Sequence, residues 1–598
     1  PTPRGEGVIR GIFIGLFCLT LAGCEGVIGG AEGGSRRGDD GPTANTGTSY
    51  GYASQASLLR LTKAQHQRTM EDLLGHFLGD DADAVLFEIE PAYGIIPDDP
   101  SSLDVGELVG STFSRMSQTV GELHIRGYFD IAQTAAGMIA QDDILRPQMF
   151  GACVDTPDDD HSACIGPFID SFGLRAIRRP LTDEEYEFFL HTVFADDGSD
   201  YQATPGALSD LLVAFFMSPS FLYRIETGGE EIEDGLYELD AYGLATRLSY
   251  HFWDSMPDEE LLAAAADGSL LTEAGYAAQV ERVYADERTK RTFAQFFYEW
   301  LELYKTGDPF GGVTSGNPQK MVFIEGADVT PELRAHMIDE VLEMTEYYRT
   351  AGTFDELFTS PFSFARSADL ASIYEVPVWS GGEPSVEFPT PERLGLLGRG
   401  ALLSAATVNT HPILRGVRIR ENFMCDVLGT PPANVNQNVE DLEGLVTTRE
   451  RVESLTSPSS CAGCHQFING LGFPLEVFDS LGRHRSDEMV IDIEGGVTML
   501  PVDAVATPFI DGPGDDRRVS GPNDLVDQLL AGGKLQRCFA QHYVRFALGL
   551  TADPAFGGDP ETIEVLGDAL TDGLPLGEVF KELAYLPAFK QRLRGDES

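Results

Sequence analysis

Two cysteines and a histidine stand together in the stretch Cys461-Ala462-Gly463-Cys464-His465. This spacing is typical of covalent attachment of a c-type haem, because two intervening residues let both sulfurs reach the vinyl side chains of the porphyrin. The histidine follows directly, so its ring can ligate the iron from one face. We therefore expect a covalently bound haem c at Cys461, Cys464 and His465.

Three other interpretations of these residues stay open. A disulfide between Cys461 and Cys464 would suit an oxidising compartment, but it would give His465 no role. A zinc ion could bind all three, yet a structural zinc site takes four ligands and the sequence has no second pair of cysteines at this spacing. The motif could also be a degenerate haem site that is kept for packing.

The second axial ligand of such a haem is also open. We favour Met499, because it lies in an irregular segment downstream of the motif, where cytochromes often place this ligand. An empty position would instead permit small-molecule or peroxide chemistry. The other candidates are methionines and histidines elsewhere in the C-terminal half, namely Met489, His484, His542 and His411.

The N-terminal sequence indicates export. Two arginines precede an apolar run over residues 11–21, which is too short to span a membrane and ends in small residues, as a secretory signal does. Leu21-Ala22-Gly23-Cys24 resembles a bacterial lipobox and predicts that Cys24 is acylated. A plain cleaved signal is the alternative. We expect an envelope lipoprotein, in the outer membrane or the periplasm, with the membrane as a partner through this anchor.

Cysteines of exported proteins tend to form disulfides. Cys153 and Cys164 bracket a short polar loop that suits a local disulfide. Cys425 and Cys538 then remain as a long-range pair. The sequence thus predicts two disulfides outside the C-x-x-C-H motif.

The charge balance excludes one class of partner. There are 95 acidic and 42 basic residues, which gives a net charge of −53. Such a chain repels phosphate backbones. We therefore expect no binding to nucleic acid.

Helical periodicity dominates the chain after the N-terminal segment. Thr62 precedes an apolar helical pattern as an N-cap, and Thr182 with Glu185 forms a capping box. A further helix is expected from Val417 to Leu428, where a glycine and two prolines follow. The fold class predicted is mainly α.

A chain of 598 residues is too long for one core. We predict multidomain helical bundles with a C-terminal cytochrome-c-like helical domain that contains some irregular or strand segments. The predicted parts are a lipoprotein signal peptide (1–24), a flexible linker (25–56), an N-terminal helical module (57–145), a short helical module with a disulfide loop (146–205), a helical module (206–310), a helical extension (311–384), the C-x-x-C-H module (385–510) and a C-terminal helical module (511–598).

Several segments, in this order, resemble a family of secreted multidomain proteins of uncharacterised modules known from planctomycetes and myxobacteria. They include RLTKAQHQRTMEDLLG, LRAIRRPLTDEE, LDAYGLATRLSYHFWDSMPDEELL, PILRGVRIRENFMCDVLGTPPANV, TTRERVESLTSPSSCAGCH, LGFPLEVFDSLGRHR and CFAQHYVRFALG. The resemblance implies a cytochrome-like site and no other assigned chemistry. Where the family has an Ile-Asp-Pro-like turn after the motif, this chain has Ile468-Asn469-Gly470, which we also expect to turn.

Taken together, the sequence favours electron transfer or haem-dependent oxidation at the cell envelope, with an unidentified redox partner. The alternative is a non-redox envelope scaffold or polymer-binding protein in which Cys461 and Cys464 form a structural disulfide. A polysaccharide hydrolase would need paired carboxylates, and the sequence nominates no such pair.

Overall fold

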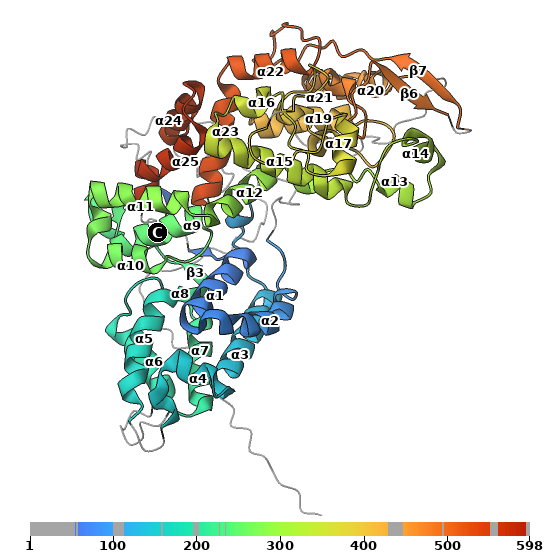
Figure 1. Ribbon diagram of the computed structural model, residues 1–598. Helices are drawn as coiled ribbons and strands as arrows, with labels where there is room; N and C mark the ends of the chain where they lie inside the picture. The colour runs from blue at the N-terminus through green and yellow to red at the C-terminus, as the bar shows by residue number, and fades with distance from the viewer. Residues whose placement is uncertain are drawn as a thin grey trace, which may run out of the picture. The chain divides into compact units, whose positions relative to one another are not determined.

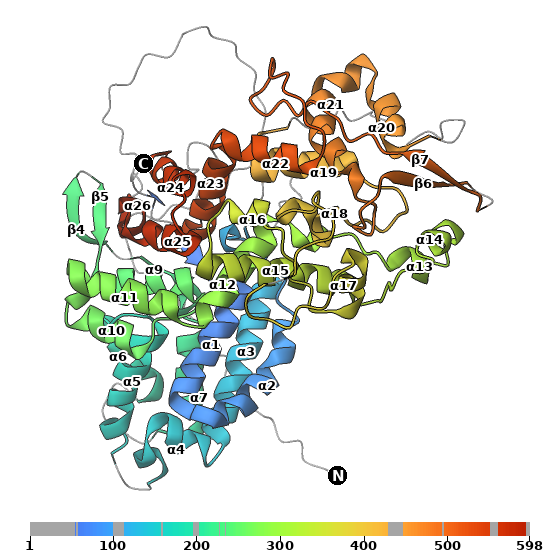
Figure 2. The ribbon, with the colours of Figure 1, turned by 45° about the horizontal axis from the view of Figure 1, so that its top comes forward.

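Helices make up most of the structure, a computed structural model shown in Figures 1 and 2. It describes residues 54–55, 58–99, 113–156, 160–194, 203–226, 228–233, 235–384, 386–428, 446–492, 495–549 and 560–593. The predicted signal peptide, Cys24 and nearly all of the predicted linker lie outside these residues. Among the helices described, none is both long enough and apolar enough to cross a membrane.

The N-terminal helices surround a core of their own. Leu73, Ile131, Phe172 and Phe215 are fully or almost fully buried in it. Helix α3 packs against both α2 and α7 in this group. The helices are α1 (Lys63–Leu78), α2 (Ala82–Tyr93), α3 (Glu122–Gln141), α4 (Leu145–Phe150), α5 (Ser162–Ala176), α6 (Asp183–Val193), α7 (Pro205–Phe216) and α8 (Pro219–Leu222).

The middle helices share a second, larger core with the C-terminal helices. Phe293, Phe296 and Trp300 of α12 contact Phe539 and Phe580 from near the end of the chain. Figure 2 shows the red C-terminal helices beside the green α12 and α15. The middle helices are α9 (Ala241–Phe252), α10 (Glu259–Ala266), α11 (Glu273–Ala285), α12 (Arg288–Trp300), α13 (Gly311–Thr314), α14 (Pro318–Phe323), α15 (Leu333–Ala351), α16 (Glu356–Thr359), α17 (Ala368–Tyr374) and α18 (Gly400–Leu403).

The remaining helices include the one that carries the C-x-x-C-H motif. They are α19 (Pro412–Arg418), the π-helical turn η7 (Ile419–Phe423), α20 (Thr448–Thr456), α21 (Ser459–Gly472), α22 (Pro522–Ala531), α23 (Lys534–Leu548), α24 (Pro560–Thr571), α25 (Leu576–Tyr585) and α26 (Pro587–Lys590). Short 3-10 turns occur at η1 (Gly79–Asp81), η2 (Ser114–Met116), η3 (Ala152–Asp155), η4 (Ser269–Leu271), η5 (Leu303–Lys305), η6 (Leu396–Gly398) and η8 (Phe473–Val477).

Three small sheets complete the described part of the chain. The largest has the strand order β1 (Ser54–Gln55), β8 (Gln591–Leu593), β5 (Leu236–Leu239) and β4 (Gly228–Glu233), with only the β1–β8 pair parallel. Strand β2 (Leu59–Arg60) pairs with β3 (Tyr223–Arg224), and β6 (Asp487–Ile491) pairs with β7 (Val497–Pro501). The expected mainly helical fold with minor strand content is confirmed.

The helix starts that depend on local capping are confirmed. The Thr62 hydroxyl accepts from the Gln65 N–H at 3.1 Å, and the Gln65 side chain returns a bond to the Thr62 N–H. Thr182 and Glu185 form the expected capping box at α6. Such caps satisfy main-chain groups that the first turn of a helix leaves open.

Two local predictions near the motif are wrong. The helix expected over 417–428 begins at Pro412 instead, since proline suits the first turn of a helix, and it passes into the π-helical η7. The turn expected at Asn469-Gly470 is absent, because both residues lie within α21.

Residues 51–594 group as one compact unit, and the module boundaries inside it stay predictions.

Candidate functional site

One helix carries all three residues of the C-x-x-C-H motif. Cys461, Cys464 and His465 lie on α21 at relative positions i, i+3 and i+4, which places them on the same side of the helix. Cys464 is exposed, while Cys461 and His465 are half-buried. A Cβ added at Gly463 would meet no atom within 4 Å. The first turns of α21 are therefore exposed at Gly463 and Cys464, whereas residues 468–472 at its other end are buried.

The imidazole of His465 is oriented by a buried amide. Its Nδ1 lies 3.2 Å from Oδ1 of Asn469, and Asn469 Nδ2 donates to the Thr456 hydroxyl of α20 at 2.9 Å. An amide oxygen can only accept, so Nδ1 carries the proton and Nε2 keeps its lone pair. Nε2 is then the nitrogen that can bind a metal, and hydrogen bonding of the other nitrogen is typical of metal-ligating histidines.

Glycines allow the C-terminal end of α21 to approach its neighbours at backbone distance. A Cβ at Gly470 would lie 2.0 Å from the carbonyl oxygen of Thr507, and one at Gly472 would lie 1.9 Å from that of Pro412. Gly416 of α19 meets the carbonyl of Ile468 in the same way, at 2.1 Å. Any side chain larger than the hydrogen of glycine would push these elements apart, so main-chain contacts hold the C-terminal end of α21 in place.

The buried side chain of Arg420 links α21 to the segment that follows β7 through hydrogen bonds. Arg420 donates to the carbonyl oxygen of Phe467 at 2.6 Å and to that of Pro508 at 2.8 Å. It also pairs with Asp426 at 3.0 Å. Bonds from a charged donor to carbonyls are stronger than neutral ones, so Arg420 helps to hold the motif helix in place.

The family-like segments around the motif supply a buried ionic group. Glu476 pairs with both Arg415 and Arg485 at 3.1 Å, and it accepts from the Thr410 hydroxyl at 2.6 Å. Burial raises the pKa of Glu476, while the two arginines oppose that rise. Sequence analysis assigned no role to these residues, and their burial and ion pairs indicate that they hold the segments of this module together.

The three motif residues do not converge on a point. Among the residues the structure describes, the one group of cysteine, histidine or carboxylate ligands within 4.8 Å of one another is Cys425, Cys538 and His542, and the motif residues form no such group. A zinc ion would need its ligand atoms to meet at a single centre. The spread along α21 instead fits a haem, in which two sulfurs bind the ring edge and one nitrogen binds the iron.

The candidates for the second axial ligand lie in different surroundings. Met499 lies in strand β7 rather than in an irregular segment, and 52% of its side chain is exposed. Met489 is paired opposite it on β6 and packs against a small cluster with Phe323 and Leu481. His484 lies against Phe478. Met499 as the sixth ligand stays a prediction.

The antiparallel packing of α19 on α21 separates His411 from His465. Gly416 meets Ile468, and Pro412 meets Gly472, so His411 lies near the C-terminal end of α21. His465 precedes Gly472 by seven residues, which is about 10 Å along a helix. His411 is therefore poorly placed as a partner ligand of His465.

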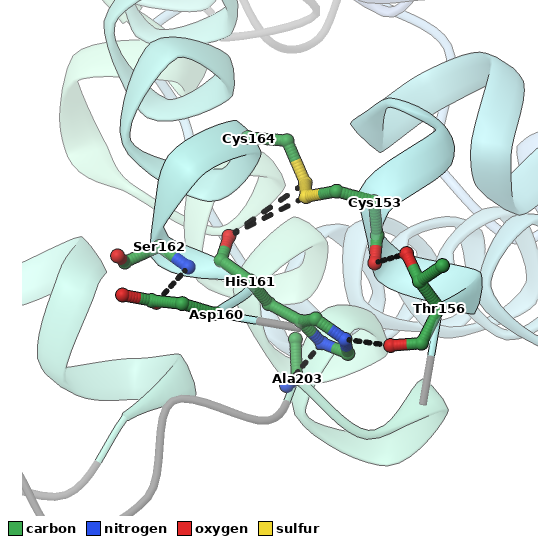
Figure 3. Close-up of a disulfide and its surroundings, with 7 residues drawn as sticks. All are labelled: Cys153, Thr156, Asp160, His161, Ser162, Cys164 and Ala203. Carbon is green, nitrogen blue, oxygen red and sulfur yellow. Dashed lines mark hydrogen bonds between the residues drawn. A yellow bond between two sulfur atoms is a disulfide. The ribbon is translucent and has the colours of Figure 1, made fainter. Parts of the chain in front are cut away.

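The structure contains both disulfides expected from the sequence. Cys153 is joined to Cys164, with a Cα–Cα distance of 6.2 Å, and Cys425 to Cys538, at 5.4 Å. Figure 3 shows that the carbonyl oxygen of His161 faces both sulfurs of the first bridge. The His161 ring accepts from the Ala203 N–H at 2.8 Å, so this histidine organises the loop. Cys461 and Cys464 take no part in either bridge.

Comparison with known proteins assigns three stretches of the chain to families. Three family models match it. They are PSD5, a protein of unknown function (DUF1595), over residues 164–226; PSD4, a protein of unknown function (DUF1592), over 239–376; and PSCyt3, a protein of unknown function (DUF1588), over 393–488. The chain therefore carries three uncharacterised modules in the order that the resemblance implied, and the PSCyt3 stretch contains the C-x-x-C-H motif. No curated protein and no solved structure matches the chain.

Proposed function

We propose that this protein is an exported, lipid-anchored haem protein that transfers electrons at the cell envelope. The observation that carries the proposal is the arrangement of Cys461, Cys464 and His465 on one face of α21, with Nε2 of His465 left available by Asn469. The family name PSCyt3 contains the abbreviation used for cytochromes, which supports the same proposal.

The residues of this chain would hold the haem in defined ways. Cys461 and Cys464 would form thioethers with the vinyl side chains, and Nε2 of His465 would be an axial ligand. When bound, the haem supplies a one-electron redox centre. Asn469 fixes the ring plane of His465 and keeps the proton on Nδ1, while Thr456 holds Asn469.

Export and anchoring are part of the proposal. Haem of this type is generally attached outside the cytoplasm, so the secretory signal at residues 1–24 fits the motif. An acylated Cys24 would keep the redox centre next to the membrane, where a redox partner could meet it. The acidic surface, with a net charge of −53, would favour a basic partner.

The test is expression of the full chain in a host that processes lipoproteins and matures c-type haems. We expect covalent haem in the intact mass and in a pyridine haemochrome spectrum after denaturation. Cys464→Ala and His465→Met should lower the haem content strongly, whereas a matched Cys153→Ser/Cys164→Ser variant should keep it. A colourless wild-type chain with an oxidised Cys461–Cys464 pair would overturn the proposal in favour of the non-redox scaffold.

A further inference from the structure

A second group of sulfur and nitrogen ligands lies where two distant segments meet. Cys425 follows η7, while Cys538 and His542 lie one turn apart on α23. The three ligand atoms all lie within 4.8 Å of one another, and Nε2 of His542 is 3.4 Å from Sγ of Cys425. The two sulfurs are joined as a disulfide. A ligand set of this size and composition is what a small soft metal ion requires.

The imidazole of His542 is held in a form that can bind metal. Its side chain is buried, and hydrogen bonds to the main chain of Glu421 and Asn422 hold the ring. Burial, together with nearby Arg545, lowers the pKa of His542 to about 3. The ring is held with Nε2 facing Sγ of Cys425, and a ring nitrogen in this position can ligate a metal next to the sulfur.

An uncompensated positive charge lies on the same face of α23. Arg545 stands one turn beyond His542 and is 95% buried by side-chain and main-chain neighbours, with 5% of its surface exposed. Within the described part of the chain, its Nε and Nη2 have no hydrogen-bond partner. Burial lowers its pKa, and no carboxylate among the described residues opposes this. A buried cation of this kind calls for a negative group nearby.

We propose that reduction of the Cys425–Cys538 disulfide creates a binding site for Cu(I), with two thiolates and Nε2 of His542 as ligands. Two thiolates and one monovalent cation leave a net charge of −1, which Arg545 would offset. Thiolate ligands prefer Cu(I), and three ligands suffice for it, whereas a structural zinc site needs four. The described residues offer three ligand atoms here.

Reduction of the Cys425–Cys538 disulfide needs a dithiol as reductant. One of its thiolates attacks Sγ of Cys425, which is half-exposed, because Cys538 is only 3% exposed. The disulfide bond breaks, and Cys538 leaves and takes up a proton. The second thiol of the reductant then closes its own disulfide and releases Cys425. Two hydrogens pass to the protein, and both are lost as protons when Cu(I) binds the thiolates.

The experiment uses the full chain with Cys153→Ser, Cys164→Ser, Cys461→Ala and Cys464→Ala, so that no haem or other bridge interferes. The matched background variant carries Cys425→Ser and Cys538→Ser in addition, and it accounts for Cys18 and Cys24. Each is reduced with a dithiol under anaerobic conditions, freed of reductant and titrated with Cu(I) against a chromogenic chelator. We expect one more equivalent of Cu(I) in the reduced chain than in the background, and none in the oxidised chain.

Two variants test whether His542 and Arg545 contribute to the site or whether the two thiolates alone bind Cu(I). His542→Gln should weaken Cu(I) binding roughly 10- to 100-fold, the range for loss of a ligand or its support. Arg545→Met should weaken it less, and X-ray absorption of the loaded chain should show two sulfur neighbours and one nitrogen. Circular dichroism checks that each variant is folded, and Arg545→Lys should restore binding if charge is what matters.

Several results would contradict the proposal of a Cu(I) site. They are Cu(I) uptake equal to the background, full affinity in a folded His542→Gln variant, or a disulfide that no dithiol reduces while the chain is folded. Binding of Zn(II) with no binding of Cu(I) would also overturn it. None of these readouts depends on haem, so the proposal stands or falls apart from the proposed function.

Discussion

Two places in this molecule combine two cysteines and a histidine, and they do so in opposite ways. On α21, Cys461, Cys464 and His465 lie within five residues of sequence, and the side chains spread along one partly exposed helix face. In the second place, Cys425 is 113 residues from Cys538, and the ligand atoms converge in the interior. We call them the motif face and the buried cluster.

The difference shows what each arrangement can bind. Local spacing alone produces the motif face, so its ligand must be large enough to touch points along a helix. The buried cluster exists only because the tertiary fold brings η7 to α23, and it can surround only a single atom. Composition is the same in both places, and geometry decides the chemistry.

The largest expected effect is on stability. Cys425→Ser/Cys538→Ser should lower the free energy of unfolding by about 3–5 kcal/mol, because the bridge closes a long loop. Cys461→Ala/Cys464→Ala, on the exposed face, should change it by less than about 0.5 kcal/mol. Urea unfolding followed by tryptophan fluorescence measures both. Equal losses would remove the contrast between the motif face and the buried cluster.

Lowering the pH should reduce the free energy of unfolding through His542 of the buried cluster. The pKa of His542 is about 3 in the folded chain and lies near 6.5 when unfolded, so the unfolded state binds the proton more tightly. The stabilisation is complete above pH 6.5 and is lost as pH falls toward 3, by about 1.4 kcal/mol per pH unit. Unfolding curves between pH 7 and 4 measure this slope.

The matched comparison replaces one histidine at a time. His542→Gln should flatten the pH dependence over this range, with His465→Gln as the reference curve. A slope that is unchanged in the folded His542→Gln variant would show that other groups, such as the buried His66 with its pKa also lowered to about 3, carry the acid sensitivity.

The two ends of α21 should respond differently to one methyl group, because Gly463 and Gly470 lie seven residues apart on the same side of the helix but have different neighbours. Gly470→Ala should destabilise the chain by about 2 kcal/mol, since the Cβ would lie 2.0 Å from the Thr507 carbonyl. Gly463→Ala meets no atom within 4 Å and should stabilise the helix by about 0.5–1 kcal/mol. Thermal unfolding distinguishes the two, and a destabilising Gly463→Ala would show that the N-terminal end of α21 is covered at this position.

The smallest effect concerns the support of His465. Asn469→Ala should cost about 1 kcal/mol of stability through the lost hydrogen bonds, and it should lower the haem content of the matured chain. Asn469→Asp keeps an acceptor for Nδ1 and should retain haem. If Asn469→Ala retains full haem and stability, the amide does not orient the ring.

Sequence reasoning succeeded where the cause is local. The caps at Thr62 and Thr182 depend on residues three positions away, and the loop between Cys153 and Cys164 is short enough to predict its bridge. The motif also shows directly in the sequence. In each of these cases, the interacting residues are neighbours along the chain.

It failed where distant residues decide the backbone. Gly470 lies within α21 with the carbonyl of Thr507 packed against it, and Cys425 takes a left-handed φ of 53° next to its bridge to Cys538. The buried pair of Arg415 and Glu476 also spans separate motifs. For the buried cluster there were two usable signals. Cys425 and Cys538 remained as a pair, which the structure confirms, and Cys538 and His542 are four residues apart on a predicted helix.

The larger core has a consequence for how the chain matures. The larger core includes Phe539, Phe580 and Phe589. It therefore cannot form completely until the C-terminal part of the chain has been synthesised. In the export that we propose, Cys425 would leave the translocation machinery before Cys538, and Cys461 and Cys464 would be the next thiols to follow it. Short loops close more readily than long ones, so these two compete for Cys425 in the interval. Early modification of the motif cysteines would end this competition and leave Cys425 to its native partner.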